Sequence, residues 1–267
     1  LNPSTVYAAT SSGIQKSVDA GATWVYVNNG LANFAGYESL GIAVDPVNAG
    51  VVYAATHGGI YKSAYGGANW SSSGSGLVKG LVDSATLAID PTQPSTLYLA
   101  IVIDDYISDR GVFKSVNSGK SWERLRYPPV AGRPAALTFS AMSKLYVAFD
   151  SGHLLASADG GTSWTQTSLP SQDVSALAID PVSSATIYVG TSSGSFYRSA
   201  DAGAHWTPVA SGLPRVNSVT VAASSPPTVL VGGDTGIYRG SDGAGSLARV
   251  HLGTRTLPVN AMAFDPV

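Results

Sequence analysis

One eight-residue pattern recurs along the chain and contains all of its tryptophans. The pattern reads Ser-x-Asp-x-Gly-x-x-Trp, and its copies lie 42 to 52 residues apart and end at Trp24, Trp70, Trp122, Trp164 and Trp206. A sixth, degraded copy spans residues 240–247 and ends at Leu247. Five tryptophans at one position of one pattern do not arise by chance, so internal repetition governs the fold.

A second pattern alternates with the first and reads as an apolar segment ending in Asp-Pro, followed by an apolar segment around a tyrosine. Each repeat therefore holds four short segments rich in β-branched and aromatic residues, separated by Gly, Pro, Asp and Ser. In the fifth repeat these segments are residues 176–180, 186–191, 195–199 and 206–209. Four-strand repeats of this length are typical of propeller blades.

The repeats predict an all-β fold, a six-bladed β-propeller of four-stranded antiparallel blades. The last residues of the chain have the pattern of a first strand and the first residues that of a second strand, so we expect the C-terminal strand to complete the N-terminal blade and remove the open sheet edges. We expect a single domain over residues 1–267, with blades at 260–267 plus 1–27, 40–74, 85–126, 135–168, 175–209 and 217–250.

The composition excludes several classes of protein. The longest apolar run, Leu97 to Ile103, is far shorter than the ~20 residues of a spanning helix, so no membrane span is expected. A net charge of −2 gives no footprint for nucleic acid. The absence of Cys excludes disulfides, Cys-ligated zinc and thiol catalysis. Only 12% of the residues are charged, which fits many short strands packed together.

The tryptophan pattern resembles the Asp-box, or BNR repeat, over the whole chain. In that family the motif forms the turn between the third and fourth strands of a blade. An Asp can accept hydrogen bonds from turn amides, a Gly supplies a positive φ, and a Trp buries its ring between blades. The resemblance gives a structural role to the five tryptophans and to Asp19, Asn117, Asp159, Asp201 and Asp242. We expect looser turns where Tyr65 replaces the Asp and Leu247 replaces the Trp.

Length variation separates two faces of the predicted blades. The connections between first and second strands and between third and fourth strands are short and uniform, and they share one face, the turn face. The remaining connections vary in length and share the other face, the loop face, where binding residues usually lie. Charged residues recur on this face seven residues before the position of the first-strand Asp, which is Ser140 or Ala222 in two repeats. Five of six repeats carry one: Glu38, Asp83, Arg133, Asp173 and Arg215. We predict that they form a ring that binds a polar ligand; the alternative is solvated loop charge and ion pairs between blades.

The long loop over residues 103–110 is the other outlier. Asp104 and Asp105 could contribute to a calcium site, although the spacing does not match an EF-hand loop. Alternatively, Tyr106 and Arg110 could contact a sugar, or the loop could be a solvated insertion. His57 and His153 lie two blades apart and are read as surface residues, so no metal site and no cofactor are predicted.

Proteins with Asp-box propellers include sialidases, xyloglucan-active endoglucanases, sortilin-type receptors and photosystem assembly factors. The chain lacks the Arg-Ile-Pro motif of the sialidases and has one propeller where the endoglucanases have two. We therefore expect a monomeric, non-enzymatic binding or scaffold propeller, secreted or periplasmic in a bacterium, that binds a glycan or a protein partner on the loop face. The alternative is a glycoside hydrolase-like enzyme with Asp83 and Asp173 as its acid and base.

The structural role of the repeated Asp can be tested by Asp159→Ala and Asp201→Ala. Each substitution removes the acceptor for turn amides, so the melting temperature should fall while ligand binding by the folded protein is kept. Thermal unfolding followed by circular dichroism measures the shift. Lost binding at an unchanged melting temperature would assign these residues to a functional site instead.

Overall fold

The computed structural model describes residues 5–10, 12–19, 23–31, 39–77, 82–103, 110–169, 171–222, 226–240, 247–250 and 259. All the regular elements in these ranges are strands, and they form six antiparallel sheets. This part of the chain holds no helix of the length and hydropathy that a membrane crossing requires. The described chain is therefore all-β, as the sequence predicts.

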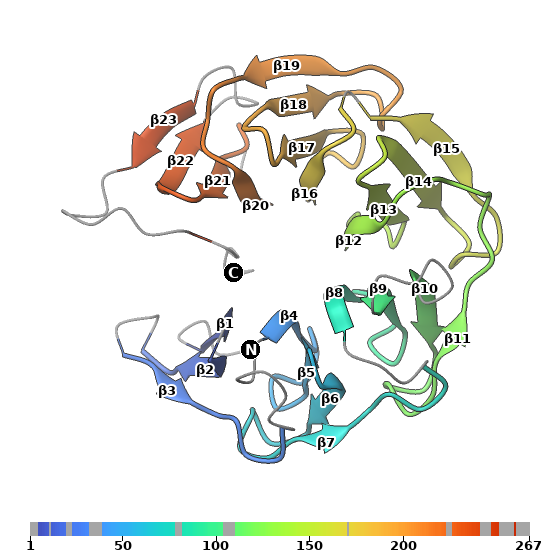
Figure 1. Cartoon of the computed structure of the whole chain (residues 1–267), viewed down its shortest axis with the longest axis vertical. Coiled ribbons are helices and arrows are strands. Elements are labelled where there is room, and N and C mark those ends of the chain that lie inside the picture. The colour runs from blue at the N-terminus through green and yellow to red at the C-terminus, as the bar shows by residue number, and fades with distance from the viewer. Residues whose placement is uncertain are drawn as a thin grey trace. The chain divides into compact units, whose positions relative to one another are not determined.

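The chain divides after Arg126 into two compact units. Unit one holds three sheets, coloured blue to green in Figure 1: β1 (Val6–Thr10), β2 (Gly13–Ser17) and β3 (Val25–Tyr26); β4 (Ser39–Val44), β5 (Val52–Thr56), β6 (Gly59–Ser63) and β7 (Ser71–Ser72); β8 (Val82–Ile89), β9 (Leu97–Ile103), β10 (Arg110–Ser115) and β11 (Glu123–Arg124).

Unit two holds the other three sheets, green to red in the same view (Figure 1): β12 (Pro134–Phe139), β13 (Leu145–Phe149), β14 (His153–Ser157) and β15 (Thr165–Ser168); β16 (Val174–Ile179), β17 (Ile187–Thr191), β18 (Phe196–Ser199) and β19 (Thr207–Ala210); β20 (Val216–Val221), β21 (Val229–Gly233), β22 (Gly236–Gly240) and β23 (Leu247–Val250).

The fold is a six-bladed β-propeller, with one blade for each sheet. The strands of every blade pair in chain order, each antiparallel to the next. The first blade shows three described strands, and the fourth strand expected from residues 260–267 lies outside the described residues. Closure of the propeller by that strand stays a prediction. The third blade begins at Val82, earlier than the expected residue 85.

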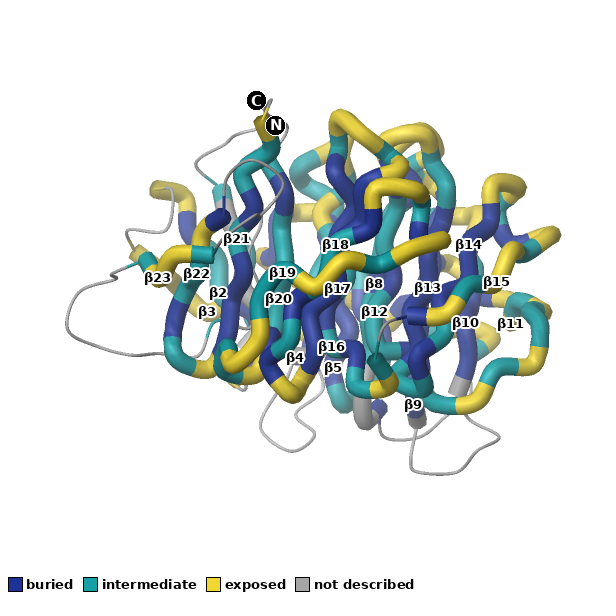
Figure 2. Tube along the Cα trace, turned by 90° about the horizontal axis from the view of Figure 1, so that it is seen from above, coloured by how far each residue is buried: buried dark blue, intermediate teal, exposed yellow. Residues whose placement is uncertain are grey.

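The second strand forms the centre of the core in the second, fourth and fifth blades. All five residues of β5, β13 and β17 are buried, without the alternation of a half-exposed sheet, and β13 and β17 are dark blue in Figure 2. Both faces of these sheets are thus covered, which explains the continuous apolar runs in the sequence. The fourth strands, such as β7 and β11, are exposed and polar.

The Asp of the Asp-Pro pattern closes the turn after the first strand. Asp180 Oδ1 accepts hydrogen bonds from the backbone N–H of Val182 at 2.8 Å and of Ser183 at 3.1 Å. Asp45 and Asp90 accept from the same relative positions in their own blades. Each carboxylate replaces the backbone partners that the turn amides lack.

Tryptophans of the first pattern join a blade to the one before it. The Trp122 indole N–H donates to the carbonyl of Ser73 at 2.6 Å, and the ring is 3% exposed. Trp70 donates to Val27 at 2.6 Å in the same way. By contrast, 38% of Trp24 is exposed. The repeated Trp is therefore an interblade contact in the second and third blades and a half-exposed residue in the first.

Cations on the third strands make a second interblade contact, which the sequence analysis missed. Lys62 lies 5.1 Å from the ring centroid of Tyr53, its partner on β5, and its ammonium donates to the carbonyl of Ser118 in the next blade at 3.1 Å. The Tyr53 hydroxyl donates to the same carbonyl at 3.1 Å. Lys16 similarly donates to the Gly66 carbonyl at 2.9 Å.

The signal for this contact is a Lys or Arg directly before the tryptophan pattern. It stands in five of the six repeats, at Lys16, Lys62, Lys114, Arg198 and Arg239. The fourth repeat has Ala156 there, and Lys144 from a neighbouring turn lies 5.2 Å from the Tyr146 ring centroid instead. A cation beside the second-strand tyrosine is thus kept even where the pattern breaks.

Lys62→Met tests this contact because methionine keeps the apolar stem and removes the ammonium. Loss of a charge-assisted hydrogen bond and a cation–π contact should lower the free energy of unfolding by about 1–3 kcal/mol. Urea unfolding measures the change. Lys120→Met, which removes an exposed lysine, is the control; an equal effect in both variants would contradict the assignment.

Candidate functional site

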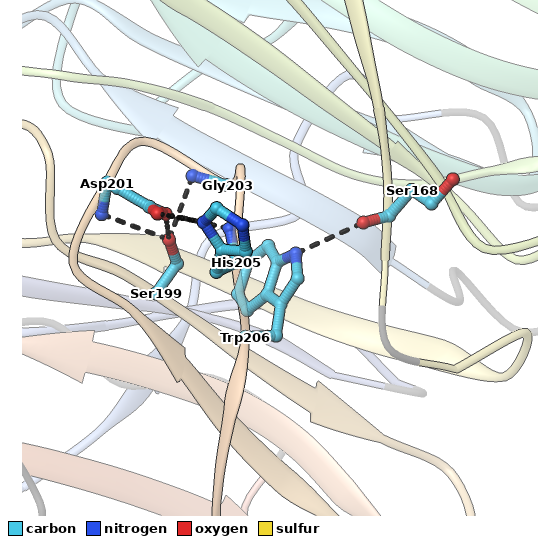
Figure 3. Close-up of polar contacts among 6 residues, drawn as sticks. All are labelled: Ser168, Ser199, Asp201, Gly203, His205 and Trp206. Carbon is cyan, nitrogen blue, oxygen red and sulfur yellow. Dashed lines mark hydrogen bonds and ion pairs between the residues drawn. The ribbon is translucent and has the colours of Figure 1, made fainter.

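The tryptophan pattern builds the same turn in blade after blade, between the third and fourth strands. In the fifth blade, Asp201 Oδ1 accepts from the Ser199 hydroxyl and from the His205 backbone N–H, both at 2.8 Å (Figure 3). The Gly203 N–H donates to the Ser199 hydroxyl at 2.9 Å, and the Trp206 indole N–H donates to the Ser168 carbonyl of the fourth blade at 3.1 Å. Gly203 has a φ of 91°, which favours glycine.

The substituted copies of the turn differ in how much of this network they keep. Asn117 keeps it, because its Oδ1 accepts from the Ser121 N–H at 3.0 Å and its Nδ2 donates to the Ser121 hydroxyl at 2.8 Å. Tyr65 has no side-chain acceptor in that place, but Ser63 still accepts from the Gly67 N–H at 2.9 Å. The turn at Leu247, expected to be loose, lies largely outside the described residues.

Hydrogen bonds to the turn carboxylates lower their pKa values. The Ser163 hydroxyl and N–H lower the pKa of Asp159 to about 2, and the Thr23 hydroxyl and N–H do the same for Asp19. The His205 N–H groups lower the pKa of Asp201 to about 2. These carboxylates are ionised at every physiological pH and act as acceptors that hold the turn, not as proton donors.

On the loop face, Asp173 is held by its own blade. Its Oδ2 accepts from the Ser193 N–H at 2.7 Å, and its Oδ1 accepts from the Ser171 hydroxyl. Partial burial acts to raise the pKa of Asp173, but the hydrogen bonds from Ser171 and Ser193 outweigh it and the pKa is lowered. The carboxylate connects the loop before the first strand to the loop between the second and third strands.

The neighbouring blades use other carboxylates for the same purpose. In the fourth blade Asp150 Oδ1 accepts from the Arg133 backbone N–H at 2.7 Å. In the sixth blade Asp234 Oδ1 accepts from the side-chain amide of Asn217 at 2.8 Å, and Asn217 lies within β20. The fourth and fifth blades therefore each join their two variable loops through one carboxylate, and the sixth joins one variable loop to the start of its first strand.

Three members of the predicted charged ring share one backbone position. Arg133, Asp173 and Arg215 each directly precede the first residue of a first strand: β12, β16 or β20. These first strands contact one another in chain order. Both arginines are exposed, and Asp173 is half-buried. The structure therefore brings two exposed guanidinium groups to the loop face on either side of an anchored carboxylate.

Asp83 occupies a different backbone position. Each described first strand carries a β-bulge, and in the third blade the bulged residue is Asp83, one residue inside β8. The hairpin of β8 and β9 extends further than its counterparts, so equal spacing from Asp90 places Asp83 inside the strand, not before it. The side chains of Asp83 and Arg110 are not described.

The remaining predicted binding residues lie outside the described part of the chain: Glu38, Asp104, Asp105 and Tyr106. Among the described residues, no group of three or more His, Asp or Glu side chains is arranged to hold a metal ion. Residues 104–109 of the loop that carries the calcium alternative lie outside the described residues. His153 contacts the Ser151 hydroxyl at 3.0 Å within its own blade.

Comparison with models of protein families identifies the family of this chain. The model of the DUF6242 beta propeller domain matches residues 108–246, just over half of the chain. The chain belongs to this family. The matched residues include all four strands of the fourth and fifth blades, with the turns at Asp159 and Asp201. A comparison with curated proteins finds no match for this DUF6242 propeller.

Solved propellers resemble this DUF6242 propeller in fold. An ancestral GH74 enzyme matches 93% of the chain with a TM-score of 0.71 and 21% identity, and the chain spans 37% of that enzyme. YCF48 from Cyanidioschyzon merolae matches 96% with a TM-score of 0.64 and 16% identity, over 84% of its own length. A structure titled YCF48 bound to D1 peptide matches 91% with a TM-score of 0.61 and 15% identity, over 76% of its length. These identities show the fold alone.

The low pKa of the turn carboxylates predicts how stability depends on pH. Because the folded-state pKa of about 2 for Asp159 lies below the unfolded value of about 3.9, its stabilisation is complete above pH ~4 and is lost as pH falls towards 2. Asp159→Asn should therefore reduce the fall in unfolding free energy between pH 5 and pH 2.5, measured by urea unfolding. Glu123→Gln, which removes an exposed carboxylate on β11, is the control; a larger effect of this control would contradict the prediction.

Proposed function

We propose that the chain is a non-enzymatic binding propeller that holds a polypeptide partner on its loop face. The observation that carries the proposal is the exposure of Arg133 and Arg215, in blades four and six, on the loop face. In the blade between them the Asp173 carboxylate accepts hydrogen bonds from Ser171 and Ser193 of its own loops. The described loop face therefore presents cationic groups to an incoming ligand.

The state of Asp173 argues against the alternative of a glycoside hydrolase. Such an enzyme needs one carboxyl group that stays protonated until it protonates the leaving group, and its pKa is raised for that purpose. The hydrogen bonds to Asp173 lower its pKa and hold its oxygens against the loop at Ser193. We therefore assign Asp173 to positioning the loop between β17 and β18.

The neighbouring folds favour a polypeptide over a glycan. The chain spans 76% of the YCF48 propeller that binds D1 peptide and 37% of the GH74 enzyme, so it corresponds to most of the former and a part of the latter. The likeness of the turns at Asp19, Asp159 and Asp201 to the Asp-box repeat, common to binding and hydrolytic propellers, fits either relative.

The chemistry of the two arginines indicates an acidic partner. A guanidinium presents five N–H donors in a planar fork that fits a carboxylate with two parallel hydrogen bonds. Because both groups are exposed, their attraction to a ligand is screened by salt. We expect a segment rich in Asp or Glu, bound more weakly as ionic strength rises.

An array of 12-residue peptides, probed with the full chain alongside a glycan array, tests the proposal. Acidic peptides should bind, and Arg133→Gln and Arg215→Gln should each lower the affinity for the best peptide about three- to tenfold, measured by fluorescence anisotropy. Lys120→Gln, which removes an exposed cation on the turn face, should have no effect.

Two results would overturn the proposal. If the arginine variants and Lys120→Gln bind the best peptide with equal affinity, the loop face is not the binding site. Cleavage of a glycan by the wild-type chain, lost in Asp173→Asn, would establish the hydrolase alternative.

A further inference from the structure

Several exposed apolar side chains of unit one lie on the turn face, opposite the variable loops. Val18 is 62% exposed, Val47 is 78% exposed and Tyr65 is 77% exposed. All three lie in the short turns of the first two blades: Val18 and Tyr65 in the tryptophan-pattern turns, and Val47 directly after an Asp-Pro pair. We call these three residues, with Asp19, the Tyr65 patch.

Hydrogen bonds connect the segments that carry the Tyr65 patch. The Gly66 N–H, next to Tyr65, donates to the Gly50 carbonyl at 2.8 Å and so joins this turn to the one that carries Val47. The Lys16 ammonium, from β2, donates to the Gly66 carbonyl at 2.9 Å and joins the same turn to the first blade, two residues before Val18. Two turns of the second blade are therefore fixed to each other and to the strand that leads into the turn of Val18.

Tyr65 replaces the Asp or Asn found in the other described turns and brings no structural gain. Its position is held in the other described turns by Asp19, Asn117, Asp159 and Asp201, whose side chains accept hydrogen bonds from the turn. Tyr65 makes no such bond, and its ring is mostly exposed, so the turn loses an anchor and the core gains no packing. Sites where a repeated local rule is broken without compensation are candidates for function.

The charge within the patch is negative. The Asp19 carboxylate, at the position equivalent to Tyr65 one blade earlier, is exposed and ionised. The Lys16 ammonium nearby is engaged by the Gly66 carbonyl and lies 5.5 Å from the Tyr7 ring centroid, so it is directed into the contact between the blades. An incoming group at the patch therefore meets aliphatic surface, an aromatic ring and a carboxylate.

We propose that the Tyr65 patch docks a polypeptide segment that carries lysine or arginine side chains among aliphatic ones. The aliphatic stems of such side chains pack on Val18 and Val47, while the cationic heads lie over the Tyr65 ring and beside the Asp19 carboxylate. This surface is separate from the loop face and takes a ligand of opposite charge, so it does not depend on the function proposed for Arg133 and Arg215.

Binding of a defined probe to the full chain tests the proposal. The probe is the peptide acetyl-(Val-Lys-Leu-Lys)3-amide with a fluorescent label, and its counterpart has Glu in place of Lys. Fluorescence anisotropy at 150 mM salt should show the lysine peptide binding at least about tenfold more tightly than the glutamate peptide. Tyr65→Asn, which removes the ring without adding a charge, should reduce the affinity for the lysine peptide about five- to tenfold.

The structure supplies variants that separate binding from folding. Tyr65→Asn introduces a residue that anchors the turn at Asn117, so its melting temperature should equal or exceed that of the wild type. Asp19→Asn should lower the affinity for the lysine peptide about threefold. The variant should keep its turn, because Asn117 forms the same turn. Val182→Thr, which changes a 64% exposed valine after an Asp-Pro pair in unit two, is the matched control and should leave binding unchanged.

Three outcomes would overturn the proposal: equal binding of the lysine and glutamate peptides, unchanged affinity in Tyr65→Asn, or an equal loss in Val182→Thr. Analytical ultracentrifugation of the wild type adds a fourth. A dimer that Tyr65→Asn converts to a monomer would assign the patch to contact between copies of the chain.

Discussion

Contact between neighbouring blades is the interaction on which the rest of this structure depends. A small four-stranded sheet cannot bury both of its faces alone, so each blade is stable only where the next one covers it. Within unit one, hydrogen bonds as well as apolar packing hold neighbouring blades together. The Trp122 indole and the Lys62 ammonium both donate to backbone carbonyls across a blade boundary. Those bonds set the position of one repeat on the next.

The need to hold the blades and their turns together explains which residues are available for binding. The repeated turns use their Ser, Asp and Gly residues for internal hydrogen bonds, and the loop carboxylates Asp150 and Asp173 join the two variable loops of their blades. The two proposed surfaces are instead built on exposed side chains, the arginines on the loop face and Tyr65 at the substituted turn position.

Some of this organisation could be predicted because the sequence repeats, so each structural position occurs several times and its residues can be compared. Strand order, the turn between third and fourth strands, and the acceptor role of Asp159 all follow from one aligned pattern. The bulge at Asp83 could not be predicted, because equal spacing along the chain conceals a longer hairpin in the third blade. The role of Lys62 was missed because its partners, Tyr53 and Ser118, lie in another strand and another blade.

The sequence by itself determined the class of fold, the number of repeats and the chemistry of the turns, since these depend on spacing and on residues close together in the chain. Only the tertiary structure decided which charges are engaged and which are exposed. Asp173 and Arg215 are equivalent in sequence, yet one is held by Ser193 and the other is exposed. The reason is physical: a carboxylate is an acceptor that backbone N–H groups of an adjacent loop can satisfy, whereas a guanidinium must find acceptors that those amides do not provide.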